Sequence, residues 1–141
     1  SMVDAAPKGA IEFFHGYTYS AIPCSVAAGL AMQDIFDKED LFNRSKEMSP
    51  YFLDGLFSLK DIEGITDIRG YGMMGGIDLR MDERLGKAGY ACFKSLFASG
   101  LSLKATGDCL IVAPPFISEK KHIDEIIEKL RTGITKYFKE Q

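Results

Sequence analysis

The feature that most constrains this sequence is the run at residues 13–23, Phe-Phe-His-Gly-Tyr-Thr-Tyr-Ser-Ala-Ile-Pro. Gly16 allows the backbone to come close to a ligand. Thr18 and Ser20 supply hydroxyl groups, and main-chain N–H groups just before a helix favour anions. Pro23 suits the first turn of a helix. The run is therefore suited to a phosphate group, although a glycine turn that leads into a helix is more often plain structure.

The same run closely resembles the HGYTYSxHP stretch of class III pyridoxal-phosphate-dependent aminotransferases, in particular the ω-amino acid (β-alanine):pyruvate type. Three later blocks resemble signatures of this family in the same order, at residues 67–77, 105–108 and 113–117. In the family, the Gly-Tyr-Thr turn reaches across the dimer to the cofactor phosphate of the partner subunit. The resemblance therefore implies that Tyr17, through its main chain, and Thr18, through its hydroxyl and main chain, contact pyridoxal 5'-phosphate.

The sequence before the turn contains no counterpart of the family's catalytic centre. In the family, the lysine that forms the Schiff base lies well upstream, as do the aspartate on the pyridine nitrogen and the aromatic residue stacked on the ring. Lys8 is the sole lysine before the turn and lies too close to it. We therefore expect the C-terminal portion of such an enzyme, with no catalytic residue of its own and no activity alone. The alternative is a free-standing, non-catalytic association module derived from the same fold, so whether the chain by itself is an enzyme stays open.

Lys104 is the candidate substrate-binding residue. It stands two residues before the Thr-Gly-Asp block at 106–108, where the resembling ω-aminotransferases have an arginine that holds the substrate carboxylate. A lysine keeps the positive charge but lacks the two-pronged fork that matches a carboxylate. Because strand lysines usually face solvent, the residue type alone favours a plain surface position. The resemblance implies contact with the amino donor or the keto acid in the intact enzyme.

Composition describes an ordinary globular protein. The chain has 141 residues, 46% of them hydrophobic and 26% charged, and a formal charge of −3, which gives no reason to expect nucleic acid or an anionic membrane surface. No apolar run is long enough to span a bilayer. The three cysteines fit neither a metal site nor a redox pair. We expect buried, unreactive thiols in a reducing cytoplasm and no metal site.

Apolar periodicity predicts an α+β layout. Helical patterns cover residues 24–36, 41–59, 85–99 and the segment after Ser118, which is the expected cap of the last helix. Residues 65–79 alternate as a strand does, with glycines that indicate a bend and close approach of another backbone. Residues 101–104 and 109–113 read as a hairpin.

The order of these elements indicates a small, mostly antiparallel sheet covered by helices. It agrees with the C-terminal small domain of fold-type I pyridoxal-phosphate enzymes. We assign residues 1–36 to the tail of a large cofactor-binding domain and residues 37–141 to the small domain. Without the large domain, the apolar helix after Pro23 would be exposed, so we expect a homo-oligomer.

Overall fold

The computed structural model describes residue 18 and residues 20–139. The elements follow in the order α1 (Pro23–Lys38), α2 (Leu41–Phe57), the 3-10 helix η1 (Ser58–Asp61), β1 (Ile65–Tyr71), β2 (Met74–Leu79), α3 (Lys87–Ala98), β3 (Lys104–Thr106), β4 (Cys109–Val112) and α4 (Lys120–Lys139).

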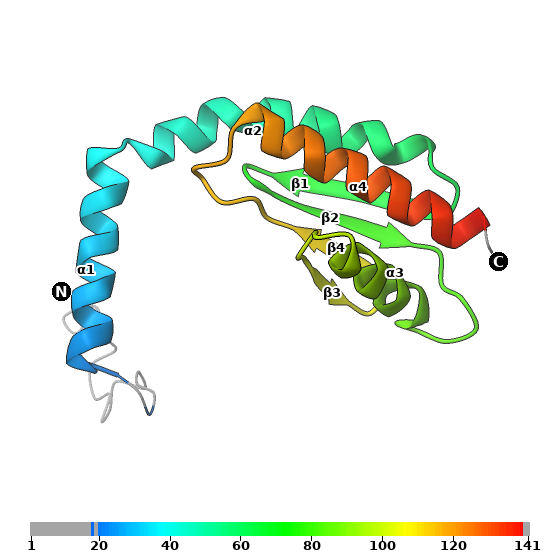
Figure 1. The fold of residues 1–141 in the computed structure, drawn as a ribbon, viewed down its shortest axis with the longest axis horizontal. Helices are drawn as coiled ribbons and strands as arrows, with labels where there is room; N and C mark the ends of the chain where they lie inside the picture. The colour runs from blue at the N-terminus through cyan, green and yellow to red at the C-terminus, as the bar shows by residue number, and fades with distance from the viewer. Residues whose placement is uncertain (1–17, 19, 140–141) are drawn as a thin grey trace, which may run out of the picture.

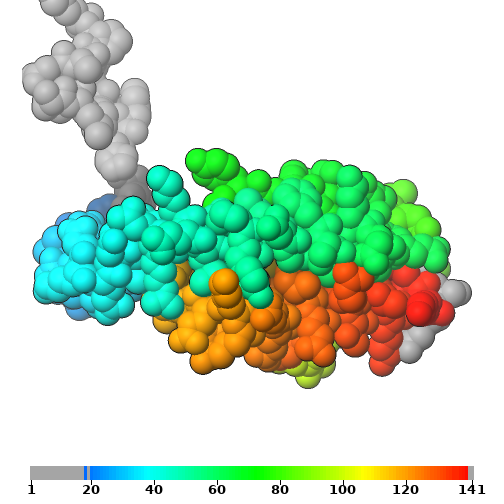
Figure 2. All heavy atoms as spheres, turned by 90° about the horizontal axis from the view of Figure 1, so that it is seen from above, coloured from blue at the N-terminus to red at the C-terminus, as the bar shows by residue number. Residues whose placement is uncertain are grey.

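The four strands form one antiparallel sheet in the order β1-β2-β4-β3. Helices α2, α3 and α4 lie over a single face of this sheet, and α2 and α4 run side by side (Figures 1 and 2). This arrangement confirms the expected small antiparallel sheet covered by helices. No helix of the described residues covers the other face of the sheet, which we call the open face.

The core lies between the sheet and the three helices because each element presents one apolar side there. Alternate residues of the two central strands are buried, as expected for strands with one covered face. Helix α4 contributes a stripe at helical spacing. The fully buried members of this core include Phe52, Leu56, Ile77, Leu96, Leu110, Ile123, Leu130 and Ile134.

The segment at residues 65–79 has the expected strand character, and the expected bend at its glycines is the turn of a hairpin between β1 and β2. Gly72, with φ of +59°, lies in the tight connection between β1 and β2, where glycine has no steric cost. The expected close approach of another backbone is found at Gly70, where a Cβ would lie 3.1 Å from the carbonyl oxygen of Met74, and a side chain comes closer still to β2. A Cβ at Gly75 would lie only 2.1 Å from Cδ2 of Leu56 on α2.

Helix α4 is capped differently from the expectation. Ser118 is buried before the helix begins, and its backbone N–H donates to the carbonyl of Pro115. The carbonyl of Glu119 accepts from the N–H of Ile123, and the N–H of Glu119 donates to Nδ1 of His122 at 3.0 Å. His122 therefore takes the part that Glu or Gln plays in a capping box.

Helix α1 extends away from the rest of the molecule (Figure 1) and contains no buried residue. Its contact with the body includes a cluster in which the ring of Phe36 lies 5.0 Å from that of Phe42 and 5.8 Å from that of Phe116. Cys24 is consequently exposed, whereas the sequence predicted a buried thiol. Cys92 is buried as expected, and Cys109 is partly buried.

Two adjacent glycines of β2 provide a test of this packing. Gly75→Ala should lower the free energy of unfolding by about 1–3 kcal/mol, because the new methyl group meets the fully buried Leu56. Gly76→Ala is the matched control, since its Cβ would lie on the open face with Sγ of Cys109 at 3.4 Å. Urea denaturation of both variants measures the difference, and equal losses would contradict the assigned faces.

Candidate functional site

Lys104 is the first residue of β3, a three-residue strand at the edge of the sheet. Residues paired across antiparallel strands share a face, and Arg69, Gly76, Ile111 and Lys104 are paired in turn across the four strands. Gly76 and Ile111 alternate with the buried residues of their strands, so this row lies on the open face. Lys104 is exposed there.

The two cations of the sheet strands, Arg69 and Lys104, differ in their partners. The Arg69 guanidinium donates to both oxygens of Asp78, including an Nη2–Oδ1 distance of 3.1 Å, and to Asp67 at 3.1 Å. Lys104 forms no ion pair with any residue in the described part of the chain. Of these two strand cations, Lys104 is therefore the one available to an added anion.

The Arg69 cluster alters the titration of its neighbours. Hydrogen bonds from Arg69, followed by one from Cys109, hold the pKa of Asp78 below its usual range. Burial, and then the hydrogen bond to Asp78, raises the pKa of the Cys109 thiol. Both effects favour a neutral thiol beside an ionised carboxylate. The sequence motifs gave no sign of this cluster, although the alternation of Asp78 with the buried Ile77 and Leu79 places the Asp78 side chain on the face opposite the core.

Asp108 joins the turn after β3 to the start of α3. Its buried carboxylate accepts hydrogen bonds from the backbone N–H groups of Gly86 at 2.8 Å and Gly89 at 3.0 Å. Gly89 packs so closely on this turn that a Cβ there would lie 2.1 Å from the carbonyl oxygen of Gly107. Asp108 thus caps a helix whose N-terminus would otherwise leave these donors unpaired. The separation of about twenty residues explains why no local pattern predicted this cap.

Thr18 is exposed in a turn before α1, and Tyr17 lies outside the described residues. Because α1 stands away from the sheet, the structure does not bring Thr18 and Lys104 together (Figure 1). In one chain they are separate surfaces. A single site that includes both Thr18 and Lys104 would therefore need a further protein segment or a second subunit.

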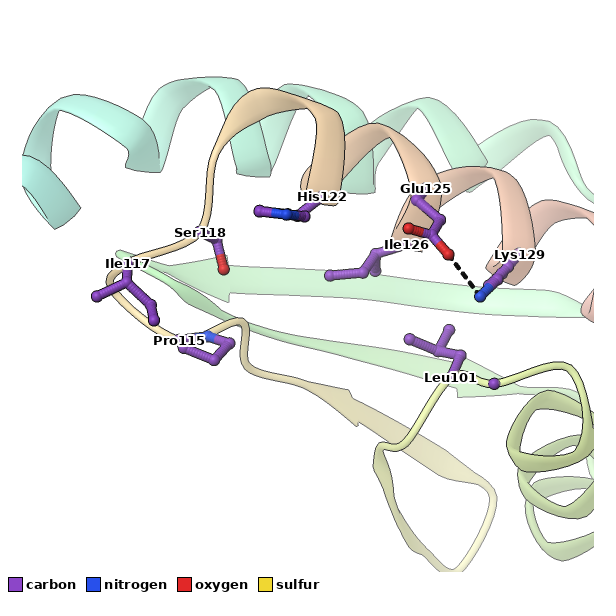
Figure 3. Close-up of a pocket in the computed structure, with 9 residues that line it drawn as sticks. Leu101, Pro115, Ile117, Ser118, His122, Glu125, Ile126 and Lys129 are labelled. Atoms are coloured by element: carbon purple, nitrogen blue, oxygen red, sulfur yellow. Dashed lines mark ion pairs between the residues drawn. The ribbon is translucent and has the colours of Figure 1, made fainter.

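A hollow of about 330 Å³ lies between the first turns of α4 and two loops (Figure 3). Its imidazole and its charged side chains already have partners, since His122 accepts from the N–H of Glu119 and the Lys129 ammonium is 2.6 Å from the Glu125 carboxylate. Leu101 and Pro115 form much of the opposite wall. The hollow thus offers little for binding a charged substrate, and His122 serves the helix terminus.

The described residues offer neither a metal site nor a membrane-spanning helix. They include no group of three or more side chains placed to hold a metal ion. None of the helices in this part of the chain combines the length and apolar character needed to cross a bilayer.

Comparison with known proteins identifies the family. Residues 2–134 match the family model described as Aminotransferase class-III. This chain belongs to the class III aminotransferases, as its motifs implied.

Two curated relatives are similar over most of the chain. It is 39% identical over 132 residues to the omega-aminotransferase of Caulobacter vibrioides, which covers 93% of this chain and 30% of that protein. It is 33% identical over 140 residues to the omega-amino acid–pyruvate aminotransferase of Pseudomonas putida, covering 96% and 30%. The chain therefore spans about 30% of the length of these relatives.

Solved structures share the fold. The PMP-bound aminotransferase from Vibrio fluvialis superposes with a TM-score of 0.79 at 26% identity, covering 92% of this chain and 30% of that one. The adenosylmethionine-8-amino-7-oxononanoate aminotransferase of Methanocaldococcus jannaschii gives a TM-score of 0.78 at 30% identity, covering 89% and 30%. The chain thus has the fold of one part of a larger transaminase.

Removing the Asp108 cap should destabilise the fold. We expect Asp108→Ala to lower the free energy of unfolding by about 2–3 kcal/mol, because two N–H groups lose a charged acceptor, and Asp108→Asn to cost about half as much. Asp54→Ala, at an exposed position of α2, is the control and should stay within about 0.5 kcal/mol of the parent. Denaturant titration measures all three, and a neutral Asp108→Ala would refute the cap.

Arg69→Met should raise the pKa of Asp78 towards its ordinary value. The pKa of Asp78 is lower in the folded protein than in the unfolded chain. The Arg69–Asp78 pair therefore stabilises the protein fully at pH values above the unfolded-state pKa. This contribution is lost as the pH falls through the folded-state pKa. The variant should therefore lose less stability than the parent on acidification. Carboxyl-carbon NMR titration gives the pKa, with Arg84→Met as a charge-matched control. An unchanged Asp78 titration would show that Arg69 does not cause the shift.

Proposed function

We propose that this chain is the C-terminal portion of a pyridoxal-phosphate-dependent aminotransferase that transfers an amino group from an ω-amino acid or amine to pyruvate or a similar keto acid. Membership of the family and the similarity to omega-aminotransferases support this reaction class. The chain alone is inactive in this proposal, because the upstream lysine, aspartate and aromatic residue of the family have no counterpart in it. The whole enzyme is a homo-oligomer of the cytoplasm.

The proposed domain boundary follows the packing. Residues 1–36 are the tail of the large cofactor-binding domain, and residues 37–141 are the small domain. In support, α1 contributes no buried residue, whereas the core begins with Leu41 and continues to Phe138. A helix with no core contact is typical of a segment whose packing partner lies elsewhere in the protein.

The observation that carries the proposal is the free ammonium of Lys104 on the open face. Arg69, on the opposite edge strand β1, already binds two carboxylates, so only Lys104 offers an uncompensated positive charge on these strands. Asp108 holds the Thr-Gly-Asp block at residues 106–108, which follows Lys104, against the start of α3. We infer that Lys104 binds the substrate carboxylate as a point charge.

The residues near α1 fit the phosphate of the cofactor as an accessory contact. Thr18 is exposed, and no acidic residue stands in the first turn of α1 to repel an anion. We propose that Thr18 donates its hydroxyl to the phosphate bound by a neighbouring subunit and that Tyr17 contributes its main chain. Pyridoxal phosphate, when bound, supplies the electron sink for amino-group transfer.

A free-standing association module is the second candidate function. The exposed apolar residues of α1, which include Val26, Leu30 and Met32 at 48%, 60% and 52% exposure, favour it. Large exposed apolar surfaces mark interaction sites. In this case the chain would bind a partner through α1 without contributing to any transamination.

A chimera distinguishes the two candidates. This chain replaces the region that it matches in the Pseudomonas putida omega-amino acid–pyruvate aminotransferase, and amino transfer to pyruvate is measured. We expect an active, cofactor-binding chimera, while the isolated chain shows neither turnover nor a stable visible chromophore with pyridoxal phosphate. A folded chimera that binds cofactor but does not transaminate would favour the association module.

Lys104 is tested in the same chimera. Lys104→Arg should lower the KM for the keto acid about threefold to tenfold, because the guanidinium adds a second hydrogen bond to the carboxylate. Lys104→Ala should raise that KM and leave amines without a carboxylate unaffected. Thr106→Ala, on the same face of β3, is the control. Equal effects of Lys104→Ala on both substrate types would remove Lys104 from the site.

A further inference from the structure

We propose that the contact between Glu119 and His122 is a pH-sensitive latch at the start of α4. While the imidazole is neutral, the latch fixes the loop that follows β4 to the first turn of the helix. When the imidazole is protonated, the latch opens and this turn loosens locally, while the core stays in place. The inference does not rest on the proposed function, because it concerns a contact within the chain.

The latch is a single hydrogen bond with a titratable acceptor. The backbone N–H of Glu119 donates to Nδ1 of His122 at 3.0 Å, so Nδ1 must carry a free lone pair. Glutamate or glutamine usually occupies this position of a capping box. Histidine is the side chain that normally changes its charge between about pH 5 and 8. This helix start is therefore sensitive to a pH range in which an ordinary capping box does not change.

Protonation of His122 acts on the helix start in two ways. An imidazolium ring donates from both nitrogens and cannot accept the N–H of Glu119. Its positive charge also lies in the first turn of α4, where the helix dipole disfavours a cation. Because His122 is exposed, the protonated ring can turn away from Glu119 without disturbing the core.

Two carboxylates, those of Glu119 and Glu125, face His122 from its own helix start. Hydrogen bonds from Lys121 and Lys129, respectively, are the main reason why the pKa values of these two carboxyls lie below the ordinary value. Both carboxylates therefore stay ionised down to about pH 5. The charge of this pair is thus constant over the range in which the imidazole changes its own.

Arg44 of α2 holds the same loop from another side, and its guanidinium does not titrate. It donates to the carbonyl oxygen of Ile117 at 2.8 Å and acts electrostatically on the Glu119 carboxyl. Ser118, between this contact and the latch, is buried. The loop is therefore fixed by one contact that is independent of pH and by another that depends on it.

The hollow beside His122 leaves the protonated ring without a new partner from the α3 side (Figure 3). There the wall consists of Gly100 and Leu101, and neither carries a charge that could bind the imidazolium. Ser118 and His122 belong to the wall formed by the loop and α4. Opening of the latch therefore loosens one wall of the hollow and not the other.

Amide hydrogen exchange of this chain tests the latch at about pH 7.5 and about pH 5, on either side of the ordinary histidine titration. After correction for intrinsic exchange rates, we expect the protection of the Glu119 amide to fall about fivefold at the lower pH, because a contact of ordinary capping strength is lost. Leu79 is the internal reference, since its N–H donates to the backbone carbonyl of Asp108 at 2.9 Å. Its protection should not change.

Two substitutions separate the latch from a general effect of acid. His122→Gln keeps an acceptor at this position of the capping box but does not titrate, so the Glu119 amide should be equally protected at both pH values. His15→Gln is the matched control, because His15 is the other histidine of the chain, and it should keep the full pH-dependent loss. Circular dichroism should show both variants folded.

A pH-dependent loss of protection that is absent from the parent, persists in His122→Gln or disappears in His15→Gln would overturn the inference. The parent alone provides a second criterion, which holds even where glutamine does not reach the N–H of Glu119. The midpoint of the His122 ring titration, followed by NMR, should coincide with the midpoint of the loss of Glu119 protection. Separate midpoints would show that another group opens the helix start.

Discussion

The close packing of α2 on the bare backbone of β2 is the constraint on which the rest of this structure depends. Leu56 reaches the sheet at Gly75, where any larger residue would meet its methyl group. This contact sets the spacing between the helical layer and the sheet. It also decides which residues of β2 face inward, since a one-residue shift would reverse every side chain on the strand. The open face, with Arg69 and Lys104, follows from that choice.

Periodicity predicted most of this architecture. The stripe of α2, the alternation of β2 and the hairpin of β3 and β4 are local patterns, so the four helices and the segments with strand character could be derived from the sequence. The 3-10 helix η1 and the exact division of residues 65–79 into β1 and β2 could not. The boundary of β3 was less well predicted, because the strand begins at Lys104 where pairing with Ile111 starts. Long-range contacts left no local signal. The cap that Asp108 provides for α3, across about twenty residues, became visible only in three dimensions. The contact between Glu119 and His122 spans only three residues, but the sequence favoured Ser118 as the cap because serine is a common N-cap residue.

The candidate site shows the same division between local and long-range information. The resemblance singled out Lys104, and the structure adds that its ammonium has no described ionic partner while Arg69 has two. Residue type alone could not show which of these two cations is free to bind an anion, because that difference arises from strand register and from the position of Asp78. Thr18 remains a residue assigned by motif, since the chain holds it far from the sheet and its ligand would have to come from another polypeptide.

The short outer strand β3 has a consequence for solubility. An edge strand exposes backbone groups that can pair with the sheet of another molecule, and charged residues on edge strands discourage this pairing. Lys104 stands on β3, and Asp67 and Arg69 stand on β1 at the opposite edge. The charge that we assign to substrate binding therefore also keeps separate molecules from joining edge to edge. Exchange of Lys104 for a β-branched apolar residue would leave that edge open to intermolecular pairing and make the chain prone to aggregate.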